Sequence, residues 1–509
     1  MQRARVMACV FKRDPAQCQG QVFVSLFFDG TGNNKDWNEP GLGCTQAEAN
    51  KHSNVARLYD ACIDKPEEGI FAHYIPGVGT PFKEIGDYGG PLGLGAGFRG
   101  ANRIHWAILS VLNSVHFYLT QVDMLPDHVM RAVVSGMSYD PNDPMRKLAF
   151  KTWENKLAKV VADRERKVTR INVAVFGFSR GAAAARAFAH WLFEFLAQKD
   201  GVYRLAGIPI RIHFMGLFDT VAAVGIPDGI PGADGHGSWG AHMAIHPAIE
   251  QCVHFIALHE QRGSFPLEMA RGKQVAYPGM HSDVGGGYRP GDQGKAMPDW
   301  GSSPQLSQIP LIDMHHAALV GGVPLLSSDE IQEDPGLARA FHCSPDLIAT
   351  VNDFYATCGI APSATGKPAT QAFLEAHTHQ YLQWRSGLHL PGQALERRRF
   401  YQRARKDPDQ IDLREGAEDF ATHHRSLRVA MRPPIPAGGR VGPSIANAPR
   451  VDAATARLLA ALEAPGALPP SVHKLMDDYI HDSRCAFRPT GKMESTARTN
   501  GYFRYRTFF

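Results

Sequence analysis

The sequence predicts an α/β fold in which a mostly parallel central sheet is flanked by helices and followed by a largely helical accessory region. Short apolar runs at residues 21–28, 171–176 and 208–218 are typical of strands that are buried on both faces. Each run ends in a polar or glycine-containing turn. After about residue 300 the spacing of the apolar residues becomes helical and is interrupted by prolines.

The run 171–176 leads into the pentapeptide GFSRG at residues 177–181 and then into an alanine-rich helical segment. A G-x-S-x-G pattern between a strand and a helix indicates the nucleophile elbow of an α/β-hydrolase-like fold, which exposes the serine hydroxyl above the sheet. The N-terminus of the following helix favours an anion formed beside Ser179. The alternative is a chance match in an ordinary strand–helix unit, but the flanking strand and helix favour the functional interpretation.

The other elements of this region follow in order. The run 21–28 ends in the tight turn DGTGNN at residues 29–34. Ligands bind beyond the carboxyl ends of strands in such sheets, so this turn and the GFSRG turn both belong to the expected site. The remaining patterns predict helices at 53–62, 103–119 and 145–167 and strands at 71–76, 250–258 and 273–278.

A serine nucleophile needs a base to take its proton, and the base needs a third group to hold its tautomer. In α/β-hydrolases the chain order is serine, acid, histidine. Asp219 directly follows the strand 208–218, and His281 follows the strand 273–278 on a glycine-rich loop. We therefore predict Ser179 as the nucleophile, His281 as general base and then acid, and Asp219 as the orienting carboxylate. The alternatives are His259 and His481 for the base, Asp228 and Asp283 for the acid, and a helix-capping role for Asp219.

The oxyanion hole is predicted from the same two turns. The Arg180 N–H, at the start of the helix, is one donor, and an N–H near Gly30 or Thr31 is the other. A local interpretation of the Asp29 turn is equally good, since an aspartate in a tight turn bonds its own backbone.

No cofactor or metal centre is expected. Residues 95–100 match G-x-G-x-x-G, but they follow no strand and no ribose-binding acid lies at the right distance, so we reject a dinucleotide site. No pair of the eight cysteines has the spacing of metal ligands. Calcium held by scattered carboxylates such as Asp29 or Asp283 stays open, because it leaves no spacing signature.

Composition excludes other classes of protein. Hydrophobic residues make up 44% of the 509 residues and charged residues 20%, as in ordinary globular proteins. The net charge of +4 is small beside 54 basic and 50 acidic side chains, so nucleic acid is not an expected partner. The first residues lack the apolar core of a signal peptide, and no stretch is long enough for a membrane span. We therefore expect a protein made in a cytoplasm without a signal peptide.

The patterns divide the chain into four segments, which are an N-terminal arm at 1–19, a catalytic domain at 20–300, a mainly helical accessory region at 301–470, and a C-terminal segment at 471–509 that packs back on the catalytic domain. Within the accessory region, residues 397–405 combine arginines with Phe400 and Tyr401. We interpret this stretch as a candidate surface for anionic lipid, with a solvated helix face as the alternative.

Six segments form an ordered set of motifs: FFDGTGNN, YIPGVGT, GFSRGAAAARAF, GLFDTVAAVG, ALHEQRGSFPLE and YPGMHSDVGGGY. Together they resemble the catalytic domain of the type VI secretion antibacterial lipase effectors that carry G-x-S-x-G. The resemblance covers roughly residues 20–290, and YIHDSR and GYFRYR extend it towards residue 509. In that family the serine, the FDTV aspartate and the HSDVGGG histidine form the catalytic triad. These positions are Ser179, Asp219 and His281 here.

The resemblance implies an antibacterial phospholipase of type A that hydrolyses ester bonds of membrane glycerophospholipids. It also implies a type VI secretion spike component as delivery partner, action at the target-cell membrane in the periplasm, and a cognate immunity protein in the producing bacterium. Family members carry membrane-contacting modules, for which residues 301–470 are the candidate here. Two hypotheses compete with this one: a serine esterase that acts on soluble esters, and a non-catalytic binding module that kept the fold.

Overall fold

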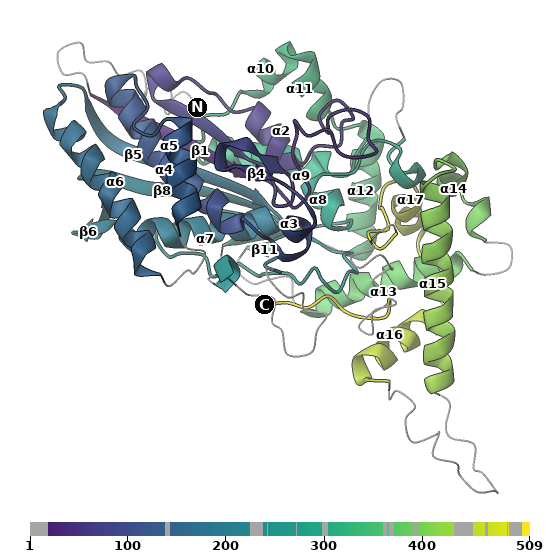
Figure 1. The fold of residues 1–509 in the computed structure, drawn as a ribbon. Coiled ribbons are helices and arrows are strands. Elements are labelled where there is room, and N and C mark those ends of the chain that lie inside the picture. The colour runs from purple at the N-terminus through teal and green to yellow at the C-terminus, as the bar shows by residue number, and fades with distance from the viewer. Residues whose placement is uncertain are drawn as a thin grey trace, which may run out of the picture.

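The computed structural model describes residues 19–137, 143–223, 238–241, 243–270, 272–297, 304–359, 364–365, 371–389, 394–431, 451–463, 467–485, 487 and 501–509. Its centre is a sheet with the strand order β11-β10-β9-β8-β5-β1-β2 (Figure 1). All neighbouring strands from β10 to β2 are parallel, and only the short β11 at the edge runs antiparallel to its neighbour. The sheet confirms the predicted α/β fold class.

All six predicted strands are present, with ends that differ by a few residues. Eight consecutive residues of β5, from Ile171 to Phe178, are buried, which explains why its sequence is apolar without alternation. The strands of the main path are β1 (Gln19–Phe28), β2 (Ile70–Ile75), β5 (Lys167–Phe178), β8 (Ile208–Phe218), β9 (Cys252–Ala257), β10 (Lys273–Tyr277) and β11 (Ala364–Thr365). A hairpin of β6 (Ala197–Lys199) and β7 (Val202–Leu205) pairs with the start of β8.

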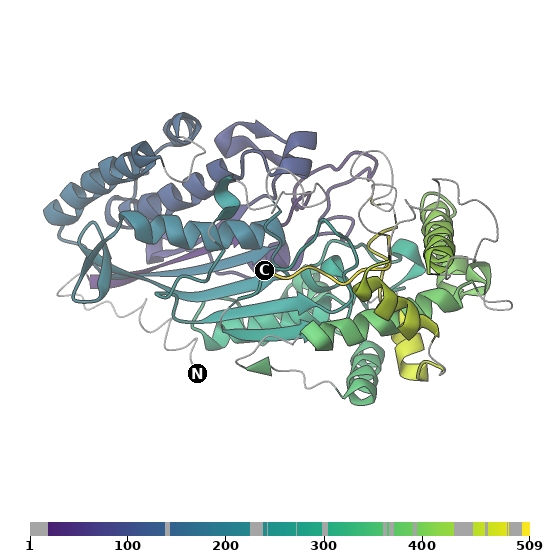
Figure 2. The same cartoon turned by 90° about the horizontal axis from the view of Figure 1, so that it is seen from below.

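Helices cover both faces of the sheet (Figure 2). One layer contains α4 (Gly100–Thr120), α6 (Pro144–Asp163) and α7 (Arg180–Phe195), with α5 (Asp127–Gly136) beside α4. The other layer contains α2 (Asn54–Asp60), α9 (Gln308–Val320), α10 (Ser328–Glu333) and α11 (Pro335–Ala340). The helices predicted at 53–62, 103–119 and 145–167 are α2, α4 and α6.

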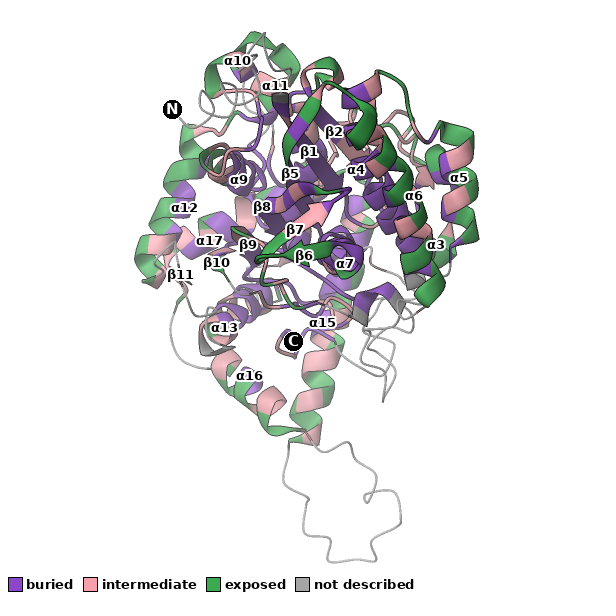
Figure 3. Ribbon diagram, turned by 90° about the vertical axis from the view of Figure 1, so that its left-hand side faces the viewer, coloured by how far each residue is buried: buried purple, intermediate pink, exposed green. Residues whose placement is uncertain are grey.

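A second group of helices lies beside the sheet and has its own apolar core (Figure 1). Its members are α12 (Pro345–Cys358), α13 (Gln371–Gly387), α14 (Arg399–Arg403), α15 (Asp409–Ala430), α16 (Ala453–Glu463) and α17 (Pro470–Asp478). The core includes Tyr381, Trp384, Phe420 and Tyr502, while the outer faces of α15 and α16 are exposed (Figure 3). This group lies largely within the predicted helical accessory region at 301–470, although α9, α10 and α11 of that range pack on the sheet. The boundaries at residues 300 and 470 stay a prediction.

The rings in the stretch 397–405 are not available to a lipid surface. Phe400 and Tyr401 are only 2% and 7% exposed. The Lys295 ammonium lies 3.6 Å from the centroid of the Phe400 ring, inside the core of the accessory region. The expectation that these two aromatic residues face anionic lipid is therefore wrong, because tertiary packing turns them inward.

Buried hydrogen bonds join the accessory helices to the sheet region. Residues 481–484 follow α17 and are all buried. His481 Nδ1 donates to Asp283 Oδ1 at 2.6 Å, and the Ser483 hydroxyl donates to Glu260 Oε1 at 2.9 Å. Both partners lie beside the ends of β9 and β10, so this connection reaches the expected site.

The last described residues also return to the sheet region (Figure 2). The Leu267 N–H donates to the Thr507 carbonyl at 2.9 Å, and the Phe509 N–H donates to the Leu267 carbonyl at 3.0 Å. The segment thus pairs with residue 267 through a single parallel bridge. Among the described helices, none combines the length and the apolar character needed to cross a bilayer.

Candidate active site

Ser179 occupies the sharp turn between β5 and α7. Its backbone is strained, with φ 57° and ψ −128°, which is the conformation expected of a nucleophile elbow. The Ser179 N–H donates to the Phe218 carbonyl at 3.1 Å, and its carbonyl accepts from the Val221 N–H at 3.3 Å. These two hydrogen bonds fix the turn to the end of β8, next to Asp219.

The two glycines of GFSRG are required because other backbone segments pass close to them. A Cβ on Gly177 would lie 2.5 Å from the Ala182 Cα, and one on Gly181 would lie 2.3 Å from the carbonyl oxygens of Phe28 and Asp29. Backbone atoms cannot move aside as a flexible side chain can. The spacing in G-x-S-x-G therefore places α7 tightly against β5 and against the turn that follows β1.

Asp219 follows β8 and is fully buried, in a left-handed conformation with φ 39°. Its Oδ1 accepts from the Ala257 N–H at 2.9 Å, and its Oδ2 accepts from His281 Nδ1 at 2.6 Å. The structure thus brings together the predicted acid and the predicted base. No helix begins at Val221, so the side chain of Asp219 does not cap one.

His281 begins α8 (His281–Gly285), and three residues separate it from the end of β10. Its ring lies between the rings of Phe178 and Phe265, with centroid distances of 4.6 Å and 4.9 Å. Burial in this apolar slot lowers the pKa of His281, and the neighbouring Asp219 only partly offsets that effect. The imidazole is therefore neutral at pH 7, with Nδ1 donating to Asp219 and Nε2 available as a base.

Ser179 lies next to Phe178, whose ring contacts the His281 ring. The structure gives the Ser179 hydroxyl no hydrogen bond among the described residues, as is common for catalytic pairs without substrate. Ser179 and His281 are only 5% and 3% exposed, so both side chains lie largely below the surface.

The turn after β1 lies against the elbow. The Arg180 side chain donates from Nε to the Thr31 hydroxyl at 2.6 Å, and a Cβ on Gly30 would lie 2.6 Å from the Phe178 ring. The Gly30 N–H donates to Asp29 Oδ1 at 2.7 Å, so Asp29 makes the local turn contact that was the alternative interpretation. Of the two expected donors in this turn, Gly30 is thus occupied, whereas the Thr31 N–H has no partner among the described residues.

Asp29 is itself buried and also accepts from the Tyr74 hydroxyl at 2.5 Å. Burial raises the pKa of Asp29 to about 6. Asp283 likewise uses its oxygens locally, since Oδ2 accepts from the Met280 N–H at 2.9 Å and Oδ1 pairs with His481. Both carboxylates considered for calcium are therefore engaged by neighbouring groups of the protein.

The residues considered as alternatives to Asp219 and His281 make other contacts where the structure describes them. His259 Nδ1 accepts from the Gly279 N–H at 2.9 Å, which ties the end of β9 to the end of β10. His481 and Asp283 pair with each other, and the His481 ring stacks on Tyr288 at a centroid distance of 3.8 Å. Asp228 lies outside the described residues.

One residue of the site was not predicted from the sequence. Arg506, in the C-terminal segment, donates from Nη1 to Asp219 Oδ1 and from Nη2 to Asp219 Oδ2, both at 2.8 Å. The GYFRYR motif contains this arginine, but nothing in the motif distinguishes it from Arg504. The partner lies 287 residues away in the chain, so only the tertiary structure reveals the contact.

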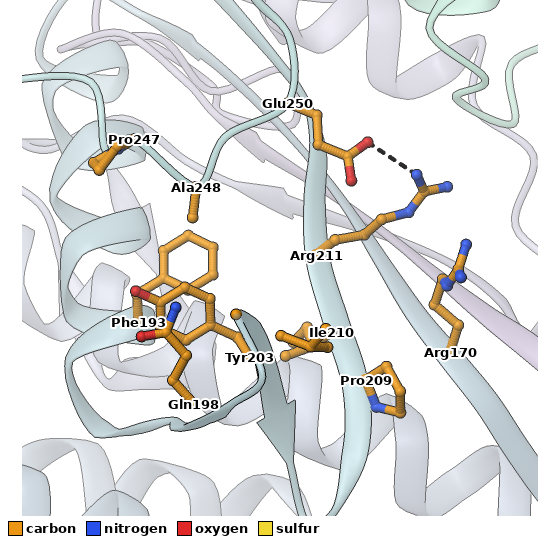
Figure 4. Close-up of a pocket in the computed structure, with 12 residues that line it drawn as sticks. Arg170, Phe193, Gln198, Tyr203, Pro209, Ile210, Arg211, Pro247, Ala248 and Glu250 are labelled. Atoms are coloured by element: carbon orange, nitrogen blue, oxygen red, sulfur yellow. Dashed lines mark hydrogen bonds and ion pairs between the residues drawn. The ribbon is translucent and has the colours of Figure 1, made fainter.

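A pocket of about 530 Å³ lies elsewhere, at the amino ends of the strands (Figure 4). Arg170 and Arg211, near the starts of β5 and β8, line it together with Glu250, which pairs with Arg211 at 2.9 Å. Ser179 and Asp219 follow the carboxyl ends of the same two strands. This pocket is therefore separate from the candidate active site.

Comparison with known proteins identifies the family. The model for the catalytic domain of the T6SS phospholipase effectors of Tle1-like type matches residues 24–200 and 196–317, more than half of the chain. The chain belongs to this family. This Tle1-like protein is accordingly a phospholipase effector of the type VI secretion system, and the matched residues include Ser179, Asp219 and His281.

Two solved structures are similar to the Tle1-like chain. An uncharacterised protein from Pseudomonas aeruginosa has a TM-score of 0.78 at 24% identity, covering 100% of this chain and 82% of that chain. This likeness extends the shared fold to the accessory helices. The Tle1 effector bound to the VgrG spike of the type 6 secretion system has a TM-score of 0.37 at 17% identity, covering 70% of this chain and 83% of that chain. No curated protein matches the chain.

The environment of His281 predicts the acidic limb of the pH profile. The folded-state pKa of His281 is below its ordinary value, so the ring stays neutral until the pH falls below about 6.5. We expect kcat/KM for a short soluble ester to be lost only below that pH, as the protonated ring ceases to accept the serine proton. A profile whose acidic inflection lies above neutrality would contradict this assignment of the base.

Proposed function

We propose that this Tle1-like protein is a type A phospholipase that cleaves ester bonds of membrane glycerophospholipids through a Ser179–His281–Asp219 mechanism. The observation that carries the proposal is the 2.6 Å contact between His281 Nδ1 and Asp219 Oδ2 beside the strained Ser179 turn. An acid, a base and a nucleophile on neighbouring strand ends are the parts that ester hydrolysis through an acyl-enzyme needs.

The steps follow from the arrangement. His281 Nε2 takes the Ser179 proton as Oγ attacks the ester carbonyl, and Asp219 stabilises the imidazolium that forms. The N–H groups of Arg180 and Thr31 receive the negative oxygen, each contributing roughly 3 kcal/mol to the lowering of the barrier. His281 then protonates the departing lysophospholipid alkoxide. A water molecule, activated by the same ring, cleaves the acyl-enzyme and releases the fatty acid.

An exposed apolar surface beside the elbow supports a membrane substrate. We define the apolar rim as Tyr88, Leu92, Leu94 and Phe98, which are 88%, 70%, 42% and 48% exposed. The segment, which contains α3 (Pro91–Ala96), is attached to the active site because the Arg180 side chain donates to the Leu94 carbonyl. Exposed apolar side chains grouped next to the catalytic serine suit contact with lipid.

Delivery and protection are proposed from the family. A protein of this family is loaded on a component of the secretion spike, is made in the bacterial cytoplasm, and acts at the membrane of the target cell from its periplasm. The producing cell then needs a cognate immunity protein. The accessory helices stay a candidate membrane-contacting region, with the exposed end of α15 rather than residues 397–405 as the surface to test.

Removal of the Ser179 hydroxyl tests its role as the nucleophile. We expect Ser179→Ala to reduce fatty-acid release from vesicles of phosphatidylethanolamine and phosphatidylglycerol by a factor on the order of 10⁴ or more, with an unchanged melting temperature. Ser282→Ala, next to the base, is the matched control and should retain activity. Positionally labelled lipid reports which ester is cut. Wild-type activity on a soluble ester with none on vesicles would favour the soluble esterase instead.

The apolar rim is tested by polar substitution. We expect Tyr88→Ser combined with Leu92→Ser to lower hydrolysis of vesicles roughly tenfold, because less apolar surface enters the lipid, while hydrolysis of a soluble ester is unchanged. Val429→Ser, at the 62% exposed Val429 near the end of α15, is the comparison. If only the α15 variant loses vesicle activity, the accessory helices rather than the rim contact the membrane.

A further inference from the structure

We infer that Arg506 is a positioning residue of the active site. It holds the Asp219 carboxylate in place and compensates its negative charge, so that His281 acts as a base only when the C-terminal segment is docked. This inference rests on the proposed mechanism and adds a fourth residue to it. Arg506 touches Asp219 and does not touch the reacting atoms, so its effect passes through the acid.

The contact is bidentate and buried. Both guanidinium nitrogens of Arg506 lie 2.8 Å from the two Asp219 oxygens, and its Nε donates to the Phe265 carbonyl at 2.8 Å. The side chains of Arg506 and Asp219 are 6% and 0% exposed. Two parallel hydrogen bonds between a guanidinium and a carboxylate fix both the position and the plane of the carboxylate.

Each oxygen of Asp219 thus accepts two hydrogen bonds. Oδ1 accepts from the Ala257 N–H and from Arg506, and Oδ2 accepts from His281 and from Arg506. With all four contacts present, the carboxylate has one orientation. That orientation directs Oδ2 to the Nδ1 of His281 and so selects the tautomer whose Nε2 is the base.

The C-terminal segment reaches Asp219 because both regions of the protein anchor it. The Tyr502 hydroxyl donates to Asp482 Oδ2 at 3.0 Å, and the Phe503 ring packs on Phe420 of α15 at 5.1 Å. At the other end, Thr507 and Leu267 pair through their backbones. Arg506 therefore arrives at the acid only when the accessory helices and the sheet region are assembled.

In the described part of the chain, charged groups of both signs lie around the His281 ring and its backbone. The anions are Asp219, which pairs with the ring, and Glu260, whose carboxylate accepts from the His281 backbone N–H at 3.1 Å. The cations are Arg262, paired with Glu260 at 2.9 Å, and Arg506, paired with Asp219. Among the described residues, each of these anions thus pairs with one of these cations, so the imidazole meets little net charge.

Loss of Arg506 breaks that balance. Burial alone raises the pKa of Asp219, but the Arg506 guanidinium and the His281 hydrogen bond outweigh it and hold this pKa well below its usual range. Without the guanidinium, the Asp219–His281 pair has an uncompensated negative charge and binds an added proton more tightly. The protonated, inactive pair then persists to higher pH.

The test compares two arginines of the same segment. Arg504 contacts the Thr507 hydroxyl at the exposed surface, so Arg504→Gln is the matched control for Arg506→Gln. With a soluble ester, we expect Arg506→Gln to lower kcat/KM at pH 7 by about 10- to 100-fold and to move the acidic inflection up by about one pH unit. Arg504→Gln should match the wild type in both respects.

Two further variants separate positioning from folding. Arg506→Lys keeps the positive charge but cannot make the two parallel hydrogen bonds to the carboxylate. We therefore expect a lower kcat with the acidic inflection close to that of the wild type. For Arg506→Ala, added guanidinium ion at low millimolar concentration should restore part of the activity, with no effect on the wild type. Both measurements remain available if the glutamine variant does not fold.

The outcomes distinguish the two levels of the proposal. An active Arg506→Gln enzyme with a wild-type pH profile, or an Arg506→Ala enzyme that folds and does not respond to guanidinium, would overturn the role of Arg506 and leave the mechanism standing. A wild-type protein that is inactive on vesicles and on soluble esters would overturn the proposed function, and the role of Arg506 with it.

Discussion

The hydrogen bond between Asp219 and His281 depends on the parallel pairing of β8, β9 and β10. Because these strands run in one direction, their carboxyl ends meet at one edge, and residues 62 apart in the chain come into contact. The sheet itself places the acid, since the Asp219 N–H donates to the Phe255 carbonyl at 2.7 Å. A register shift of one residue would turn the side chain to the opposite face and break the contact.

Charge burial holds the accessory helices to that edge. A buried ion pair adds little stability over apolar packing, but loss of one partner costs roughly 3–5 kcal/mol because the other charge remains buried. Two buried contacts connect the C-terminal segments to this edge of the sheet, namely the hydrogen bond between His481 and Asp283 and the ion pair between Arg506 and Asp219. A shift of the accessory region against the sheet would break these contacts and leave buried polar groups without partners, so the contacts favour one arrangement of the two parts.

The sheet, the flanking helices and the placement of Ser179, Asp219 and His281 follow from local sequence, since Ser179 and Asp219 directly succeed buried strands and His281 lies in the short turn after another. The role of Arg506 does not, because the segment GYFRYR offers two equivalent arginines and the partner of one is fixed only by tertiary structure. The sequence could not decide between the Gly30 and Thr31 N–H groups as oxyanion donor, because the choice depends on the direction of the Asp29 side chain. Phe400 and Tyr401 look exposed in a basic stretch, and only the packing of Lys295 against Phe400 shows that they are buried.

The position of Arg506 in the chain has a consequence for synthesis in the producing cell. The ribosome completes the elbow, the acid and the histidine loop long before it adds this arginine, 287 residues after Asp219. A nascent chain, or a product of premature termination, therefore carries the reacting groups with their acid still uncompensated. On the role proposed for Arg506, hydrolytic competence therefore arises only after the polypeptide has been made up to this residue, long after its reacting groups.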